Sequence, residues 1–291
     1  MLIAFTFTLS KAIVNLAQPV FIIGIRMTVA GIIIISFTLL NKHKISSIQT
    51  IHYKYIILIS FFHIYITYIF EYISLKHINS SKACLLYSVT PFITALLSYK
   101  VFREKLLIQQ LFGLSIGILG ILPIIFNTAQ CNNSKYLIFN FISFPEIMLL
   151  CSVLSSSLGW ITIKYLITNH KYSIISINGL SMFLGGILAL CTSFFFEKTP
   201  KIYSTNHLHT LLIFFLYLFL LILISNIICY NLYAYLLKKF SATLLAFSGF
   251  SCPLFSALLG YLFLGEKISK EFFLSSFTLT LGIYIFYKKQ Y

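Results

Sequence analysis

The sequence predicts an all-α integral membrane protein of about ten transmembrane helices, arranged as two inverted five-helix repeats. Of its 291 residues, 59% are hydrophobic and only 9% are charged, whereas soluble domains carry about 25% charged residues. Apolar runs of about 20 residues recur along the whole chain, and each is long enough to span a hydrocarbon core about 30 Å thick. Self-comparison then divides the chain into two matching halves.

Each apolar run between polar segments is expected to form one helix. The expected helices cover residues 1–17, 20–40, 54–76, 78–102, 107–127, 144–168, 172–196, 209–237, 240–264 and 269–288. The longest polar stretch inside the chain, residues 127–143, separates the first five from the last five. We therefore expect a first repeat over 1–127, a polar linker over 128–143 and a second repeat over 144–291. Because the first helix is short, either the first span is truncated or the start site is misplaced.

Basic residues lie mostly in the loops and give the chain a net charge of +15. In a soluble protein this excess would suggest nucleic-acid binding. Here, anchoring to anionic lipid and control of topology explain it, so we expect no nucleic-acid partner. An even number of spans puts both termini on one side. With cytoplasmic termini, the inside segments hold more Lys and Arg than the outside segments, which favours a multi-pass protein of the bacterial inner membrane in this orientation.

A shift of 162 residues lays the second half of the chain on the first without a gap. The matched residues include Pro91 with Pro253, Glu104-Lys105 with Glu266-Lys267, Tyr68 with Tyr230, and Gly120 with Gly282. Apolar composition alone would match Leu and Ile, but would not readily match these residue types at one shift. Because each repeat has an odd number of spans, the second enters the membrane with opposite polarity. Inverted repeats build many secondary transporters, which hold their substrate near the midplane.

The repeated residues also resemble a known family. The first half carries Ser80-Ser81-Lys82-Ala83, Pro91, Glu104, Gln110, Gly113, Gly117 and Gly120, and the second carries Ser241-Ala242-Thr243, Pro253, Glu266 and Gly282. Over nearly the whole chain this pattern resembles the EamA-type family of the drug/metabolite transporter superfamily. The resemblance implies ten spans in two inverted repeats, cytoplasmic termini, and a central cavity lined by the first, third, fourth, sixth, eighth and ninth spans.

The chain departs from the family pattern in two places. The family's first span usually carries Trp-Gly ahead of a lysine, but this pair is missing before Lys11, whereas Gly159-Trp160 precedes Lys164 in the second half. Ser275 and Leu279 stand where the first two repeated glycines would be.

Lys11 and Lys164 lie within apolar runs of the two halves. An isolated charge at the bilayer centre costs about 2.5–3.5 kcal/mol on insertion scales, so such residues normally face a cavity or a partner. We predict a pair of cationic groups for an anionic or carboxylate-bearing substrate, with snorkelling near a helix end as the alternative. Arg26 also lies in an apolar run, but its span is peripheral in the family it resembles, so a structural contact between helices is favoured.

His63, Thr67 and Glu71 are spaced i, i+4, i+8 and therefore share one helix face. His63 and Glu71 are candidates for accepting and passing a proton, and the alternative is that Glu71 only hydrogen-bonds near the outer water. Further polar and aromatic candidates for the substrate-binding cavity are Tyr68, Tyr87, Trp160, Asn226, Tyr230 and Tyr233. They suit a zwitterion or a purine, although interhelical hydrogen bonds or, for Trp160, interfacial anchoring would also explain them.

Pro91 and Pro253 are expected inside two helices at matching places. Because proline removes a backbone hydrogen bond, paired kinks suggest hinges for gating, and static bends are the alternative. The two glutamates that follow these helices, Glu104 and Glu266, are expected to cap the next span.

The sequence argues against an enzyme and against a metal site. It contains no Asp for Mg²⁺ binding, no Cys-x-x-Cys pair, and no P-loop, and His207 and His209 lack a third ligand. We therefore expect no cofactor and no metal.

The leading hypothesis is a secondary transporter that moves a small metabolite, an amino acid or an S-adenosylmethionine-like compound, by alternating access. The alternatives are an exporter of metabolites or drugs and a lipid-flippase-type subunit of the same fold. High Ile, Lys, Asn, Tyr and Phe with little Ala is typical of an AT-rich bacterial genome, and host-dependent bacteria with such genomes import these metabolites through the family it resembles. The expected partners are the substrate and the lipid bilayer, with a monomer or homodimer as the assembly.

Overall fold

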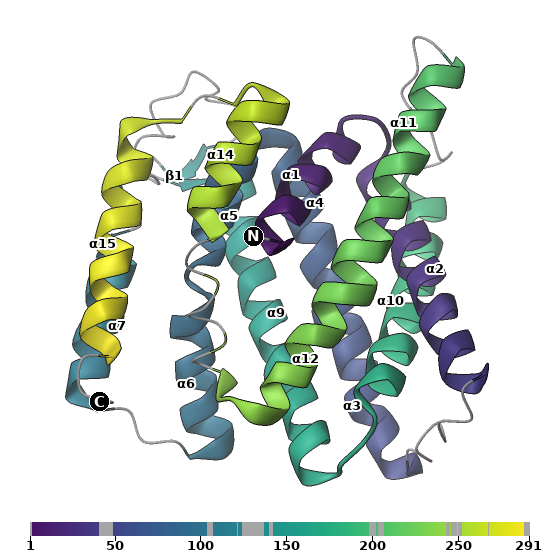
Figure 1. The fold of residues 1–291 in the computed structure, drawn as a ribbon, viewed down its shortest axis with the longest axis horizontal. Coiled ribbons are helices and arrows are strands. Elements are labelled where there is room, and N and C mark those ends of the chain that lie inside the picture. The colour runs from purple at the N-terminus through teal and green to yellow at the C-terminus, as the bar shows by residue number, and fades with distance from the viewer. Residues whose placement is uncertain are drawn as a thin grey trace.

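The computed structural model describes residues 2–40, 49–103, 107–120, 122–123, 137–139, 142–197, 202, 207–242, 245, 249, 252–266 and 268–287. In these ranges the chain forms a bundle of helices (Figure 1), with one antiparallel pair of short strands, β1 (Leu137–Phe139) and β2 (Ile142–Ser143), and a single bridge between Ala17 and Ile202. The predicted all-α class is confirmed. The strand pair lies in the segment predicted as a linker, of which residues 128–136 and 140–141 fall outside the described ranges.

Among the described residues, six helical segments are long and apolar enough to cross a membrane. They are α2 (Pro19–Leu40), the segment Tyr53–His77, the segment Ser80–Phe102, α9 (Phe144–Asn169), α10 (Ile174–Phe196) and the segment Leu208–Lys239. Shorter helices complete the bundle: α1 (Leu2–Val14), α7 (Ile108–Leu119), α14 (Cys252–Leu264) and α15 (Lys270–Tyr287). Helix α1 has 13 residues, or about 20 Å at 1.5 Å per residue, which is less than the hydrocarbon thickness. The predicted count of ten spans stays a prediction.

Large apolar side chains cover the outer surfaces of the bundle. Exposed examples from different helices are Phe37, Phe112, Phe215, Leu262 and Phe277. Soluble monomers rarely expose contiguous apolar patches larger than a few hundred Å², so a surface of this kind suits contact with lipid tails.

Two of the long segments contain π-helical turns that the sequence did not predict. The segment Tyr53–His77 consists of α3 (Tyr53–Leu58), the π-helical η2 (Ile59–Ile66) and α4 (Thr67–His77), preceded by the short η1 (Thr50–His52). The segment Leu208–Lys239 lies in α11 (His207–Leu220), the π-helical η4 (Leu221–Cys229) and α12 (Tyr230–Lys239). The first residues of η2 and η4 are 162 positions apart, which is the shift that aligns the two halves of the sequence. Such turns are rare and often occur at functional sites.

The segment Ser80–Phe102 is divided into α5 (Ser80–Tyr87) and α6 (Thr90–Phe102). Pro91 lies in the first turn of α6, and Pro253 is the second residue of α14. Pro91 therefore lies inside the predicted span, just after the break between α5 and α6, where its missing N–H costs no hydrogen bond within α6. A kink at Pro253 stays a prediction. A gating hinge at either proline also stays a prediction.

Helices α2 and α10 lie together at one side of the bundle, and α7 and α15 at the other (Figure 1). A Cβ at Gly24 would lie 2.7 Å from the Leu190 side chain, and a Cβ at Gly186 would lie 2.5 Å from Thr28 Oγ1. Gly186 follows Gly24 by 162 positions and Leu190 follows Thr28 by the same interval. The contact between α2 and α10 therefore follows the internal repeat of the sequence.

Two buried glutamates tie the halves together. Ser143 donates to Glu146 through its amide and its hydroxyl in a capping box at the start of α9, and Glu146 also forms a buried ion pair with Lys82 on α5. Glu266, which follows α14, accepts hydrogen bonds from Ser80 N at 2.9 Å and Ser80 Oγ at 2.8 Å. Glu266 thus caps α5 in the other half. The sequence had predicted instead that it would cap the helix that follows it. Glu104 lies outside the described residues.

Candidate functional site

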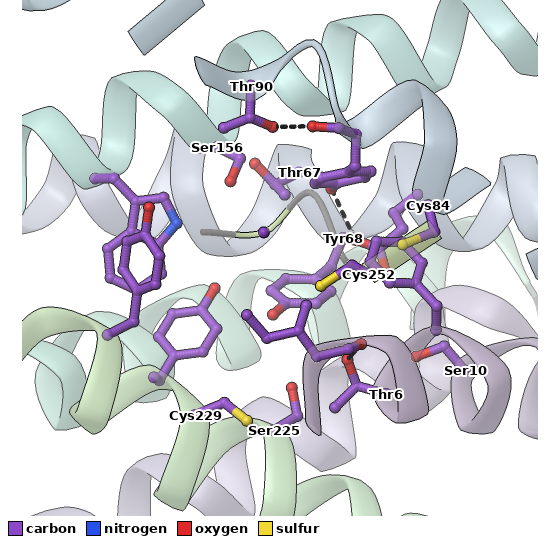
Figure 2. Close-up of a pocket in the computed structure, with 18 of the residues that line it drawn as sticks. Thr6, Ser10, Thr67, Tyr68, Cys84, Thr90, Ser156, Ser225, Cys229 and Cys252 are labelled. Carbon is purple, nitrogen blue, oxygen red and sulfur yellow. Dashed lines mark hydrogen bonds between the residues drawn. The ribbon is translucent and has the colours of Figure 1, made fainter. Parts of the chain in front are cut away.

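A cavity of about 180 Å³ lies among helices that are far apart in the chain. Its lining includes Thr6 on α1, Tyr68 on α4, Ser156 on α9 and Ser225 on η4, which surround one space in Figure 2. Both halves of the sequence therefore contribute to this cavity, and the residues just after the two π-helical segments face it.

One wall of the cavity is a row of aromatic rings. The ring centroids of Tyr68 and Tyr230 are 6.4 Å apart, those of Tyr230 and Trp160 are 5.1 Å apart, and those of Trp160 and Tyr233 are 4.3 Å apart. All four side chains line the cavity. Flat rings at these spacings offer stacking surface to a planar ligand and π-faces to a cation.

A guanidinium lies beside this aromatic wall. Arg26 is only 1% exposed and lines the cavity from α2. It donates from Nε to Asn226 Oδ1 at 2.7 Å, from Nη1 to Tyr72 Oη at 2.5 Å and from Nη2 to Ser225 Oγ at 2.8 Å. Its Cζ also lies 4.9 Å from the centroid of the Tyr68 ring. These partners are all neutral, and they fix the side chain across the contact between α2, α4 and η4.

A carboxylate lies in the same cavity. Glu71, on α4, is buried and accepts a hydrogen bond from Tyr87 Oη at 2.8 Å. Tyr87 Oη is also 2.6 Å from Ser152 Oγ on α9. Within the described ranges, no ion pair joins Arg26 or Glu71 to another side chain. The cavity therefore holds one basic and one acidic side chain whose hydrogen-bond partners are neutral.

Most of the predicted substrate-binding residues line this cavity. They are Thr67, Tyr68, Glu71, Tyr87, Trp160, Tyr230 and Tyr233. Two others lie directly behind the lining. The ring of His63 meets Trp160 edge-on with centroids 4.6 Å apart, and Asn226 holds Arg26. His63 packs so closely on Gly159 that a Cβ there would lie 2.2 Å from His63 Cβ, so His63 supports the aromatic wall rather than facing the cavity.

The two lysines predicted as cationic groups lie elsewhere. Lys11 donates from Nζ to the Leu75 carbonyl at 2.5 Å and borders a second cavity with Asn79 and Glu266. Lys164 is 9% exposed, and its Nζ lies 4.8 Å from the centroid of the Phe102 ring. The aromatic cavity therefore does not bring these lysines together, and a role for them in substrate binding stays a prediction.

The chain matches the model of the EamA-like transporter family over residues 1–126 and again over 143–288. It belongs to this family. The resemblance stated from sequence is confirmed. This EamA-like transporter is a multi-pass membrane protein of a bacterial transporter family. Its family and its relatives are described as transporters and not as enzymes.

Relatives of the EamA-like transporter include proteins with a described substrate. It is 32% identical to the "S-adenosylmethionine/S-adenosylhomocysteine transporter" of Chlamydia muridarum (strain MoPn / Nigg), over 98% of this chain and 88% of that protein. It is 30% identical to the protein of the same description from Chlamydia trachomatis serovar L2, over 98% and 86%. A solved crystal structure covers 98% of this chain and 94% of its own with a TM-score of 0.67 at 15% identity, a likeness that shows the fold alone.

Sequence reasoning missed Arg26 as a cavity residue of the EamA-like transporter. The predicted structural contact between helices is present, since Arg26 bonds to α4 and η4, but the guanidinium also lines the cavity. The signal was an arginine within an apolar run, to which the argument about intramembrane charge applies equally. Cys84, Cys229 and Cys252 also line the cavity, and each stands alone in an apolar part of the sequence with no motif that marks it.

Proposed function

We propose that this EamA-like transporter carries S-adenosylmethionine and S-adenosylhomocysteine across a bacterial inner membrane by alternating access. The observation that carries the proposal is the cavity in which a row of aromatic rings runs up to a buried arginine and a buried glutamate. The descriptions of the chlamydial relatives support the same substrate class.

The chemistry of the cavity matches the two ends of such a substrate. An adenine ring stacks on aromatic side chains with about 1–3 kcal/mol per base, which the Trp160 and Tyr233 side of the cavity offers. A sulfonium is a cation that suits the faces of aromatic rings. The amino-acid end carries both charges, which suits the end of the cavity with Arg26 and Glu71.

Alternating access requires two halves that exchange packings, and several contacts support such a relation. The glycine contacts between α2 and α10 follow the shift of 162 residues, and so does the facing pair Tyr68 and Tyr230. The family model also matches each half separately. These features support two inverted repeats around one cavity, with both termini in the cytoplasm as the distribution of basic residues predicts.

The lining also bears on the alternative functions. A lipid-handling subunit would need a cavity lined by apolar residues, because it holds an acyl chain. Two buried ionisable side chains in the lining favour a polar metabolite, because an apolar chain would leave both charges desolvated without compensation.

The test is transport by the purified protein in proteoliposomes. Uptake of labelled S-adenosylmethionine is expected to be saturable, to be stimulated by S-adenosylhomocysteine loaded inside, and to be inhibited by external S-adenosylhomocysteine far more than by methionine or adenosine alone. Empty liposomes provide the control. Absence of saturable S-adenosylmethionine uptake, or equal inhibition by free methionine at the same concentration, would overturn the proposal.

A further inference from the structure

We infer that Arg26 and Glu71 form a two-pronged site for the α-amino-acid end of the substrate, with the carboxylate on Arg26 and the ammonium on Glu71. The inference rests on the proposed function and adds the orientation of the substrate in the cavity. The amino-acid end lies between α2 and α4, and the ring end lies against Trp160 and Tyr233.

The charge of Arg26 is buried in the protein. A buried charge is strongly unfavourable unless an opposite charge and hydrogen bonds compensate it. Arg26 is almost completely buried, yet its hydrogen-bond partners Asn226, Tyr72 and Ser225 are neutral, and no carboxylate among the described residues forms an ion pair with it. A ligand carboxylate in the cavity would form the direct ion pair that Arg26 does not make with a described side chain.

The Arg26 guanidinium has more N–H donors than its hydrogen bonds within the protein use. A guanidinium has five N–H groups, and Arg26 uses one from each of its three nitrogens in these hydrogen bonds. One N–H on Nη1 and one on Nη2 remain. Arginine commonly binds carboxylates through two parallel N–H donors, whereas lysine acts as a point charge. The neutral partners therefore orient the guanidinium and leave donors for a carboxylate.

The acidic side chain for the ammonium of the ligand is Glu71. Glu71 lines the same cavity, and an ionised carboxylate accepts at about four lone-pair sites, of which the bond from Tyr87 occupies one. In an α-amino acid the carboxylate and the ammonium sit on the same carbon, so one headgroup presents both charges together. A zwitterion placed here would pair with both buried side chains at once, which a simple anion or cation would not do.

The experiment compares matched ligands with and without the α-carboxylate. Binding of labelled S-adenosylmethionine to the purified, detergent-solubilised protein is measured in competition with S-adenosylhomocysteine, with the decarboxylated analogues of both compounds, and with 5′-methylthioadenosine, which lacks the amino-acid end. The wild type is expected to bind each carboxylate-bearing compound about 10- to 100-fold more tightly than its decarboxylated analogue, the range that a hydrogen bond to a charged group supports.

The variants assign that preference to a residue. Arg26→Gln is expected to lose the 10- to 100-fold preference, so that each pair of ligands binds alike, while 5′-methylthioadenosine binding changes little. Arg26→Lys keeps a charge without the paired donors and should retain only part of the preference. Arg103→Gln makes the same change at the end of α6, away from the cavity lining, and should behave as the wild type.

Each outcome decides the inference. If the wild type binds decarboxylated ligands as tightly as their parents, the inference is overturned without any variant, even if Arg26→Gln fails to fold. If Arg26→Gln weakens all ligands equally, 5′-methylthioadenosine included, Arg26 is structural and the inference fails. If the wild type binds neither S-adenosylmethionine nor S-adenosylhomocysteine, the proposed function itself is wrong.

Discussion

Glu146 and Glu71 are both buried acids at the contact between the two halves, yet their partners differ in kind. Glu146 forms an ion pair with Lys82 and caps its own helix, whereas Glu71 accepts from a tyrosine and faces the cavity. A buried charge with an ionic partner is already compensated by the protein. The fold thus pairs one buried acid with a base, whereas Arg26 and Glu71 are held by neutral hydrogen-bond partners at the cavity.

The largest expected effect is on stability at the first glutamate. Glu146→Gln should lower the free energy of unfolding by about 3–5 kcal/mol, because Lys82 would stay buried without its carboxylate. Thermal unfolding of the purified protein in detergent measures this. Glu71→Gln is the matched control, and it should change the free energy of unfolding by less than about 1 kcal/mol, since the amide oxygen can still accept from Tyr87. Equal losses in the two variants would erase the distinction between the two sites.

Glu71→Gln, which should have little effect on stability, should have a large effect on transport. Glu71→Gln is expected to lower the initial rate of S-adenosylmethionine uptake at low concentration by about 10- to 100-fold, because the ammonium loses an ionic hydrogen bond. Glu271→Gln, at the start of α15 and away from the cavity lining, is the matched control. Uptake in proteoliposomes of equal protein content measures the effect. Wild-type rates in Glu71→Gln would mean that this acid does not contact the substrate.

A somewhat smaller effect is expected at the other end of the cavity. Trp160→Ala should weaken binding of adenosyl compounds by about 5- to 100-fold through lost stacking, and Trp160→Phe should recover part of it. The affinity for 5′-methylthioadenosine should fall as much as that for S-adenosylmethionine, because the effect concerns the ring end. Unchanged affinity in Trp160→Ala would move the ring end away from this wall.

The smallest expected effect is at Lys164, which the sequence predicted as part of a cationic site. Lys164→Ala should reduce uptake by less than about 5-fold, since its Nζ lies 4.8 Å from the centroid of the Phe102 ring and Lys164 is not among the residues that line the cavity. The same uptake measurement serves. A loss as large as that of Glu71→Gln would restore the hypothesis of a cationic site at Lys164.

The membrane class, the family and much of the cavity lining could be predicted because they depend on pattern along the chain. Tyr68 and Tyr230 were selected as matching residues of the two halves, and their rings are neighbours in one wall of the cavity. Arg26 was assigned a structural contact alone because its helix was expected at the periphery, and helix order says nothing about how far a long side chain reaches. The π-helical turns were also missed, because a single extra residue per turn leaves no mark on an apolar run.

The sequence by itself determined that the chain lies in a membrane, that its halves repeat, and that it belongs with EamA-like transporters, because composition and spacing carry that information in one dimension. Only the tertiary structure decided which polar groups share a cavity. Lys164 and Arg26 look alike in sequence, each a single cation in an apolar run. The rotation of each helix about its axis, and the neighbours packed against it, place one beside Phe102 and the other beside Tyr68.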